Sequence, residues 1–357
     1  MAWITADYSK KAVKRAGECL INEDASDDAV SSAMDVLSNW RSAHAYPMHA
    51  VLIFLRNQSA KIDANSIVVQ RLKRTPSIVG KLKRIDGIKL HRMQDISGCR
   101  SVVASIRKVR ALRDSIVNSR TRHKLHREDD YISQPKVSGY RGVHLVYKYN
   151  GRKNEYQDYF VEIQIRSKVQ HAWATAVEVV EHFTKQALKS SQGNKDWLDF
   201  VQYASEEFSK IENSTVDPRL AGTDTYAEMK RLEQKLNAKV RLNAFTVSTQ
   251  FIAERSDRKS DYFLLELTEH ASKIQVTQFP PETLGQATQQ YIECEKKAKE
   301  QPEYDVVLVS ASSVHSLMAA YPNYFADSKD FLGYLDRTIQ RYEETKNATK
   351  KGDRPQF

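Results

Sequence analysis

The chain has 357 residues, of which 41% are hydrophobic, and a formal net charge of +10 from 55 lysines and arginines against 45 aspartates and glutamates. This length favours two domains, and no apolar run approaches the length of a membrane span. The N-terminus lacks the apolar core of a secretory signal, and the three cysteines form no Cys-x-x-Cys pair that would indicate a zinc ribbon. We therefore expect a cytoplasmic protein without a membrane partner.

The first 70 residues are predicted to be helical and to form the N-terminal part of the first domain. Residues 29–40 and 50–56 carry apolar side chains at helical spacing, and Pro47 indicates a turn between them. After residue 94 the pattern changes to short β-prone runs at 99–105 and 144–149. The sequence therefore predicts helices followed by strands.

The stretch from residue 159 to 166 alternates strictly between apolar and polar side chains. In a strand, one face would carry Val161, Ile163 and Ile165, and the other Glu162, Gln164 and Arg166. A strand with an apolar back and a polar front is how a sheet presents a catalytic surface. Long helices are predicted to follow over 169–189 and 196–212.

The turn residues at 213–222 indicate a domain boundary. Beyond it we expect an amphipathic helix from about 225 to 255, with Val240 and Val247 on its buried face, and then a small α+β unit. The tail after about residue 345 is predicted to be disordered. The predicted parts are an N-terminal helical part at 1–70, a core at 71–215, a C-terminal regulatory domain at 223–340 and a tail at 341–357.

Two basic runs indicate a polyanionic substrate, a nucleotide or RNA. The segments 71–92 and 107–127 hold eight lysines and arginines each, against one acid each, Asp86 and Asp114. A charge run is most often a solvated helix face. Two such runs beside a candidate site favour phosphate binding over that interpretation.

Phosphoryl-group transfer requires cations for the phosphates and carboxylates for a metal. Asp95, before a Gly-containing bend, and Glu162, on the polar strand face, are the candidate metal ligands. Either residue alone is more often structural. The candidate phosphate-binding side chains, with Pro76 suited to a helix start among them, are Arg71, Lys73, Ser77 and Lys81. Tyr140 could stack on a base or be a packing residue, and His144 could be an ordinary strand histidine.

Four ordered motifs resemble those of the RelA/SpoT alarmone synthetase family. They are R-x-K-x-x-x-S-I-x-x-K from Arg71, D-I-x-G-x-R from Asp95, D-Y-I-x-x-P-K-x-x-G-Y-R-x-x-H from Asp130 and V-E-I-Q-I-R from Val161. Their order over about a hundred residues is a specific signal. The resemblance implies an α+β fold with a mixed β-sheet flanked by helices, and transfer of the β,γ-pyrophosphate of ATP to a ribose 3′-hydroxyl.

The resemblance also implies a role for each matching residue. Arg71 and Arg100 would sandwich the adenine of ATP, and its phosphates would be held by Lys73, Ser77 and Lys81. Asp95 and Glu162 would bind Mg²⁺, with Glu162 also placed to activate the attacking hydroxyl. The acceptor-nucleotide site would be lined by Lys136, Tyr140, His144 and Gln164.

The chain departs from the family pattern on the acceptor side. Gly142 stands where the family usually has serine, Ser167 stands where it usually has threonine, and a Glu-His pair is displaced to residues 181 and 182. These changes leave the identity of the acceptor open. None of the ten histidines precedes an aspartate, so a hydrolase domain like that of the long bifunctional members is not expected.

The segment AAYPNYF carries Tyr321 and Tyr324 three residues apart. It could be a turn with packed aromatic rings. It also resembles the CapRel group of fused toxin–antitoxin synthetases, in which a pseudo-zinc-finger domain with a Y-x-x-Y motif covers the adenine site until a phage capsid protein releases it. This resemblance implies autoinhibition, a role in anti-phage defence, and pyrophosphorylation of the 3′-CCA end of tRNA, which would stop translation.

Two other functions remain open. The alternative enzyme is a (p)ppGpp synthetase of the stringent response with GDP or GTP as acceptor. A catalytically inactive nucleotide- or RNA-binding module is a third hypothesis, against which the presence of both Asp95 and Glu162 argues.

Overall fold

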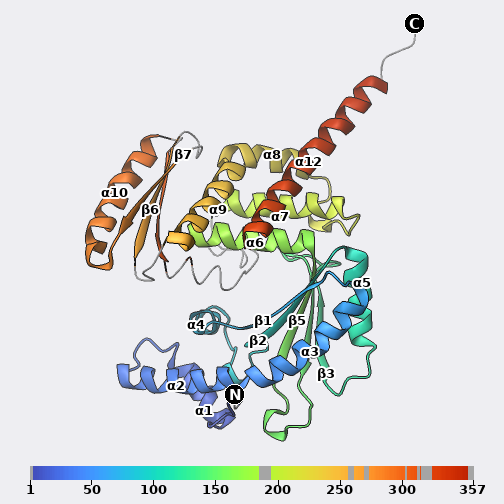
Figure 1. Ribbon diagram of the computed structural model, residues 1–357, viewed down its shortest axis with the longest axis vertical. Coiled ribbons are helices and arrows are strands. Elements are labelled where there is room, and N and C mark those ends of the chain that lie inside the picture. Colours follow the sequence, from blue (N-terminus) through green and yellow to red (C-terminus); the bar gives the residue numbers. More distant parts are fainter. Residues whose placement is uncertain are drawn as a thin grey trace. The chain divides into compact units, whose positions relative to one another are not determined.

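The structure, a computed structural model, describes residues 3–184, 194–255, 261–268, 273–301, 304–311, 314 and 324–352 (Figure 1). The chain divides into two compact units. The first unit comprises Met1–Tyr131 and Gly142–Lys168, and the second comprises Ile132–Arg141 and Val169–Phe357. Among the described residues, no helix combines the length and apolar character needed to cross a membrane.

The first unit is a five-stranded mixed sheet with helices. Its helices are α1 (Lys10–Cys19), α2 (Asp27–Ala43), α3 (Ala45–Ile62), α4 (Thr75–Arg84) and α5 (Ile106–Val117), with short 3-10 turns at Leu90–Arg92 and Asn154–Tyr156. Its strands are β1 (Ile67–Leu72), β2 (Ser97–Val103), β3 (Lys124–Asp130), β4 (Val143–Lys148) and β5 (Phe160–Ser167). The strand order is β1-β2-β5-β4-β3. Strands β2 and β5 are parallel, and every other neighbouring pair is antiparallel.

The two faces of this sheet differ in what covers them. Helix α3 packs on one face, where the Ser59 and Ser101 hydroxyls lie 2.8 Å apart and the Cys99 thiol donates to the Met48 carbonyl at 3.5 Å. Side chains alternate along a strand, so Arg100, between Cys99 and Ser101, points to the opposite face. The opposite face is therefore the polar one.

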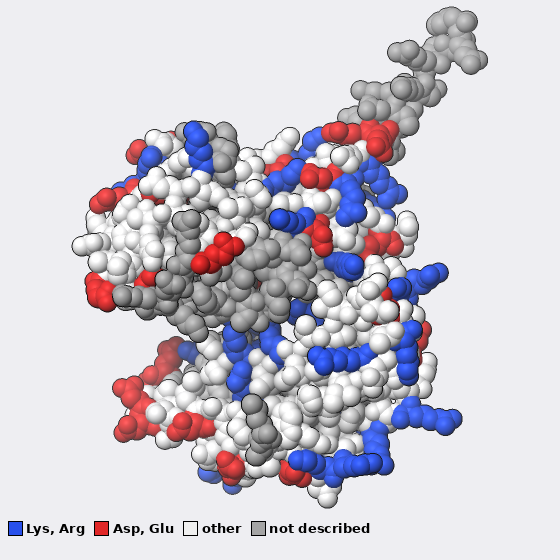
Figure 2. Space-filling model, in the orientation of Figure 1, with Lys and Arg blue, Asp and Glu red and all other residues white. Residues whose placement is uncertain are grey.

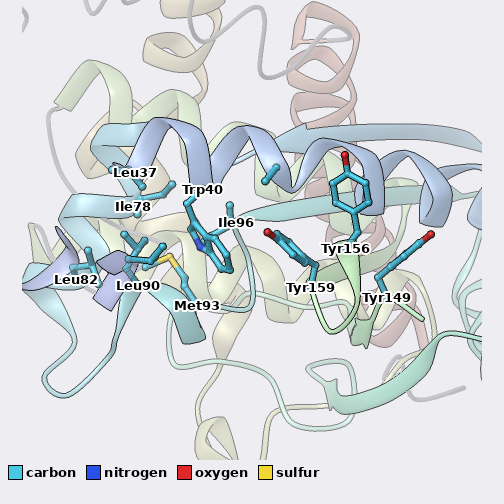
Figure 3. Close-up of a cluster of buried hydrophobic side chains, with 12 residues drawn as sticks. Leu37, Trp40, Ile78, Leu82, Leu90, Met93, Ile96, Tyr149, Tyr156 and Tyr159 are labelled. Atoms are coloured by element: carbon cyan, nitrogen blue, oxygen red, sulfur yellow. The ribbon is translucent and has the colours of Figure 1, made fainter. Parts of the chain in front are cut away.

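A buried cluster orients α4 (Figure 3). Ile78 and Leu82, one helical turn apart on α4, pack with Leu37 and Trp40 of α2. The Trp40 ring lies 5.0 Å from the ring of Tyr159. Because one side of α4 is fixed in this core, its polar residues are held on the other side.

The predicted turn at Pro47 is wrong. Helix α2 ends at Ala43, His44 follows it, and Pro47 lies in the first turn of α3. A proline in the first turn of a helix loses no intrahelical hydrogen bond, since the first N–H groups have no partner there. The residue therefore marks the start of a helix and not the gap before it.

The second unit combines helices with a three-stranded antiparallel sheet. Its helices are α6 (Lys168–Thr184), α7 (Lys195–Ile211), α8 (Thr225–Leu236), α9 (Ala238–Arg255), α10 (Leu284–Glu300) and α12 (Tyr324–Gly352), with 3-10 turns at Pro218–Leu220 and Pro281–Thr283. Strands β6 (Tyr262–Thr268), β7 (Lys273–Phe279) and β8 (Asp305–Ser310) have the order β7-β6-β8. Leu264, Ala287 and Val306 belong to a core shared by α10 and the sheet. The predicted α+β class, with a mixed sheet and a small α+β C-terminal part, is confirmed.

Three predictions in the C-terminal part are wrong. The single helix expected from 225 to 255 is broken at Asn237, which adopts a left-handed conformation with φ 48°, as asparagine readily does after a helix end. Val240 and Val247 are 36% and 50% exposed, not buried. Of the tail expected to be disordered after residue 345, the part as far as Gly352 continues α12, and residues 353–357 lie outside the described residues.

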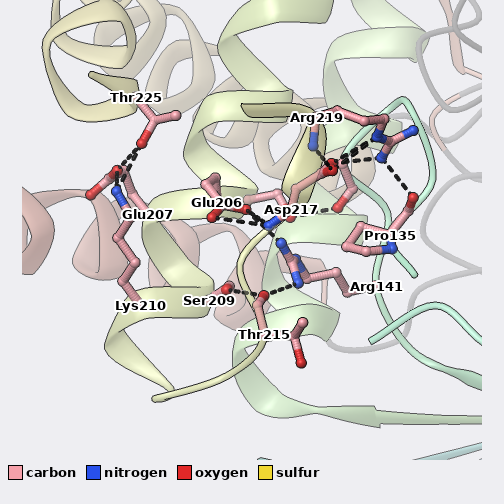
Figure 4. A network of polar contacts seen from close by, with 12 residues as sticks. Pro135, Arg141, Glu206, Glu207, Ser209, Lys210, Thr215, Asp217, Arg219 and Thr225 are labelled. Carbon is pink, nitrogen blue, oxygen red and sulfur yellow. Dashed lines mark hydrogen bonds and ion pairs between the residues drawn. The ribbon is translucent and has the colours of Figure 1, made fainter. Parts of the chain in front are cut away.

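A buried polar network holds the loop 132–141 within the second unit (Figure 4). Arg141 pairs with Glu206 of α7 at 2.6 Å and donates to the Thr215 carbonyl at 2.7 Å. The Arg219 guanidinium donates to the Pro135 carbonyl at 2.7 Å. Glu206 also accepts from the Asp217 N–H at 3.1 Å.

Glycine is required in the same loop. Gly139 has φ +85°, and an added Cβ would lie 3.0 Å from the Cα of Gln202. Both the backbone conformation and the close approach to α7 exclude a side chain there. The Ser205 hydroxyl donates to the Gly139 carbonyl, so the loop is fixed to α7 at neighbouring points.

We expect Glu206→Ala to destabilise the protein by about 3–5 kcal/mol, because it leaves the buried Arg141 charge without its partner. The side chains of Arg141 and Glu206 are 5% and 1% exposed. Urea unfolding followed by circular dichroism measures the loss. Glu228→Ala, which breaks an exposed pair with Arg231, is the matched control and should have a much smaller effect. Equal losses in the two variants would contradict the role of the buried pair.

Candidate active site

The first group of candidate residues lies where β1 passes into α4. Arg71 is exposed near the end of β1, and Lys73 follows the strand. The Lys73 backbone is held on both sides: its N–H donates to the Ile96 carbonyl at 2.7 Å, and its carbonyl accepts from Arg41 Nε at 2.7 Å. Ser77 and Lys81 lie one turn apart on α4. The segment is therefore a strand, a short link and a helix. Strand β1 was not predicted, because the first 70 residues were expected to be helical.

Asp95 forms ion pairs with two lysines of this segment. Its Oδ2 lies 3.0 Å from Lys73 Nζ and 2.8 Å from Lys81 Nζ. Its Oδ1 is buried and has no hydrogen-bond partner among the described residues. A bend does follow Asp95, at Ile96, but Gly98 is not part of it and lies inside strand β2. Asp95 therefore stands just before the bend that leads into the strand.

Glu162 is held by hydrogen bonds to both oxygens of its carboxylate. The His144 Nδ1–H donates to Oε1 at 3.0 Å, and the Gln164 amide donates to Oε2 at 2.7 Å. Gln164 Oε1 in turn accepts from Arg100 Nε at 3.3 Å and from Arg166 Nη2 at 2.9 Å. A continuous network thus runs from β2 across β5 to β4.

The strand register explains how residues distant in the sequence meet here. Gly98 of β2 is opposite Arg71 of β1 on one side and opposite Glu162 of β5 on the other. Directly paired residues share a face of a sheet. No side chain at Gly98 fills the space between Arg71 and Glu162. The register therefore leaves a stretch of sheet surface without a side chain, at Gly98, between Arg71 and Glu162.

The two carboxylates share one electrostatic environment. Burial alone would raise the pKa of Asp95, but Lys73 and Lys81 outweigh it and hold this pKa below its ordinary value, against the repulsion of Glu162. For Glu162 burial also opposes ionisation. Its pKa nevertheless lies well below the usual range, because of His144, the hydrogen bond from Gln164 and the charge of Lys81. Lys81 thus stabilises both anions.

Mg²⁺ in proteins is often bound by one or two carboxylates together with substrate phosphates. Asp95 and Glu162 fit that pattern, and the unpartnered, buried Oδ1 of Asp95 is an oxygen suited to such an ion. Among the described residues, no group of three or more histidine, cysteine or acidic side chains could hold a metal without such help. The donor set therefore suits Mg²⁺ bound with a nucleotide and not a closed structural metal site.

Two residues of this network were not predicted as site residues. Arg166, 4% exposed, binds Gln164, and the Tyr131 ring meets the His144 ring edge-on at 5.1 Å. The alternation of β5 placed Arg166 on the polar face and was a usable signal. Tyr131 and His144 stand in the same motif, which starts at Asp130, but the motif gave Tyr131 no role.

The remaining candidates do not belong to the first unit. Lys136 and Tyr140 lie in the loop 132–141, with Lys136 Nζ 5.2 Å from the centre of the Tyr140 ring. Tyr140 is buried, 6.4 Å from the ring of Trp173. Tyr321 lies outside the described residues. Tyr324 begins α12, but its side chain is not among those described.

Comparison with known proteins follows this geometry. Residues 70–185 match a region found in RelA / SpoT proteins. The GTP pyrophosphokinase YjbM of Bacillus subtilis (strain 168) is 31% identical over 160 residues, which are 43% of this chain and 71% of that protein.

Solved structures with similar folds include small alarmone synthetase 1 from Bacillus subtilis bound to its product pppGpp. It is 26% identical with a TM-score of 0.42, over 49% of this chain and 94% of that chain. A GTP pyrophosphokinase family protein from Streptococcus pneumoniae is 24% identical with a TM-score of 0.39. The match covers 46% of this chain and 84% of that chain.

The extent of the match with the Bacillus subtilis relative defines the class. The chain belongs to the RelA/SpoT family of synthetases and is a pyrophosphokinase, a transferase.

We expect Lys81→Met to move the acidic limb of the pH–activity profile to higher pH. Without Lys81 the anionic forms of Asp95 and Glu162 are less stable, so their pKa values rise and protonation stops the reaction earlier as the pH falls. Profiles normalised to their maxima measure the shift. Lys83→Met is the control, since Lys83 is exposed on the same helix and makes no ion pair with any described residue. An unmoved acidic limb in Lys81→Met would contradict this assignment.

Proposed function

We propose that this protein transfers the β,γ-pyrophosphate of ATP to a ribose 3′-hydroxyl. The 3′-oxygen bonds to the β-phosphorus, the bond between that phosphorus and the α-phosphate oxygen breaks, AMP leaves, and the hydroxyl proton is lost. The observation that carries this proposal is Asp95 between Lys73 and Lys81, in the same electrostatic environment as Glu162. Such a site supplies the charge complementarity that phosphoryl transfer requires.

The donor side of the site follows from the β1–α4 segment. Lys73, Ser77 and Lys81 would bind the phosphates of ATP, and Arg71 and Arg100 would flank its adenine. The exposure of Arg71 and the absence of a side chain at Gly98 support this arrangement. When ATP phosphates are bound, they compete with Asp95 for the two lysines, which frees the carboxylate for another cation.

Asp95 and Glu162 would hold Mg²⁺, which neutralises phosphate charge when it is bound. The low pKa of Glu162 supports this role. A carboxylate with a low pKa is a weak proton acceptor, so the direction of this pKa shift favours Glu162 as a metal ligand over Glu162 as the base that activates the hydroxyl. His144 and Gln164 would orient it.

Two acceptors are candidates. GDP or GTP is supported by the name of the Bacillus subtilis relative, a GTP pyrophosphokinase, and would make this a (p)ppGpp synthetase. The 3′-CCA end of tRNA is supported by the two basic runs, and the departures at Gly142 and Ser167 leave room for an acceptor other than GDP or GTP. A toxin role in anti-phage defence, triggered by a capsid protein and restrained through Tyr321 and Tyr324, stays a prediction because those side chains lie outside the described residues.

One incubation separates the acceptors. Purified protein, Mg²⁺ and ATP labelled in the β,γ-phosphates are mixed with tRNA, with GDP or with GTP, and the labelled products are resolved by electrophoresis and thin-layer chromatography. We expect label on a ribose 3′-hydroxyl of at least one acceptor, together with stoichiometric AMP. Label confined to guanosine nucleotides would exclude the tRNA function, and no AMP with any acceptor would contradict the proposed transfer.

We expect Glu162→Gln to lower the transfer rate by roughly a hundredfold or more, the scale on which loss of one charge-stabilising group acts. The amide keeps the size of the side chain but lacks its charge. Circular dichroism should remain unchanged. Glu155→Gln is the matched control, since Glu155 is exposed before β5, and it should retain full activity. Wild-type rates in Glu162→Gln would refute the assignment.

A further inference from the structure

The first unit contains a cavity of about 430 Å³ that no candidate site residue lines. It lies between α3, the turn that joins α5 to β3, and the turn after β4. Its volume is within the range of small-ligand sites, and it is an open depression in the surface with a largely polar lining. Phe54, half-buried, and Gln58 line it from α3. Lysine and arginine side chains gather along one side of the first unit (Figure 2).

The charge of the cavity is unbalanced. Arg120, Arg122 and Arg152 line it, and none of the described residues in its lining is acidic. None of these three arginines takes part in an ion pair among the described residues.

Four other basic residues of the run 107–127 have acidic partners. The pairs are Lys108–Asp63, Arg110–Asp130, Arg113–Glu128 and Arg127–Asp129. Arg120 and Arg122 have no such partner among the described residues, and neither do Arg107 and Lys124, which do not line the cavity. Like charges held together at the cavity favour an external anion.

The turn that carries two of these arginines is held by its own hydrogen bonds. The Thr121 N–H donates to the Ser119 carbonyl at 2.9 Å, and the His123 N–H donates to the Thr121 hydroxyl at 3.3 Å. The Asn150 N–H donates to His123 Nδ1 at 3.2 Å, so a neutral His123 carries its proton on Nε2 and can donate from there. The backbone is therefore organised before any ligand binds.

The cavity is separate from the candidate active site. Phe54 and Gln58 belong to α3, which covers the sheet face of Cys99 and Ser101. Arg100 and Glu162 point to the other face. An anion in the cavity would not occupy the place proposed for ATP.

We propose that this cavity binds the phosphate groups of a small nucleotide-like ligand, held by Arg120, Arg122 and Arg152. Guanidinium groups bind phosphate oxygens through paired hydrogen bonds, and three of them match a diphosphate or longer group. The Phe54 ring offers an apolar wall for the rest of the ligand. The concave shape favours a small ligand over the backbone of RNA.

Equilibrium dialysis with labelled inorganic pyrophosphate in Mg²⁺-free buffer tests the proposal. We expect the double variant Arg120→Ala, Arg122→Ala to weaken one binding phase by about tenfold or more, because charge-assisted hydrogen bonds are lost. The control is Arg107→Ala, Lys124→Ala. It removes the same charge from two exposed residues of the same run that do not line the cavity, and it should change binding less than about twofold.

A second arm uses a fluorescent single-stranded RNA, whose affinity should fall equally in both double variants because only net charge matters there. Equal effects of the two variants on pyrophosphate would overturn the proposal. It would also be overturned by a selective loss of RNA binding without loss of pyrophosphate binding. Thermal unfolding of both variants verifies that they are folded, and Arg152→Ala gives an independent third removal.

Discussion

The parallel pairing of β2 with β5 is the constraint on which the candidate site depends. It joins segments more than sixty residues apart and sets Arg100 beside Gln164 and Gly98 beside Glu162. A shift of one residue would turn every one of these side chains to the α3 side of the sheet. The buried alternation of Val161, Ile163 and Ile165 opposes such a shift, so the apolar back of the strand fixes the chemistry of its front.

The electrostatics of the site follow from that register. Two carboxylates are brought close enough to repel, and both are nevertheless held as anions by cations and hydrogen-bond donors. Each stabilising group comes from a different element: Lys73 from the link after β1, Lys81 from α4, His144 from β4 and Gln164 from β5. The position of Lys81 on α4 depends on the packing of Ile78 and Leu82 in the core. The buried side of this helix therefore influences the electrostatic field of the candidate site.

Much of the site could be predicted from sequence because its signals are local. The alternation of β5 revealed the polar face, and Pro76 indicated the start of α4. Strand β3 was missed because its exposed, charged residues hide the period of two, and β1 was missed because its apolar residues 67–69 stand in a row without alternation. The bend assigned to Gly98 and the turn assigned to Pro47 failed for one reason: each residue has more than one structural use, and tertiary context selects among them. Tyr131 and His144 stand in one motif, but their contact depends on the pairing of β3 with β4, which the motif does not reveal.

The division of the chain has a consequence for how the protein can vary. Lys136 and Tyr140 come from the connection between two strands of the first unit, yet they pack with α7 through Gly139 and Arg141. If Lys136 and Tyr140 have the acceptor-binding role that the resemblance implies, mutations in α7 would alter substrate preference without changing any of the proposed phosphate-binding or acidic side chains. Donor chemistry and acceptor choice would then be separately evolvable traits of one polypeptide.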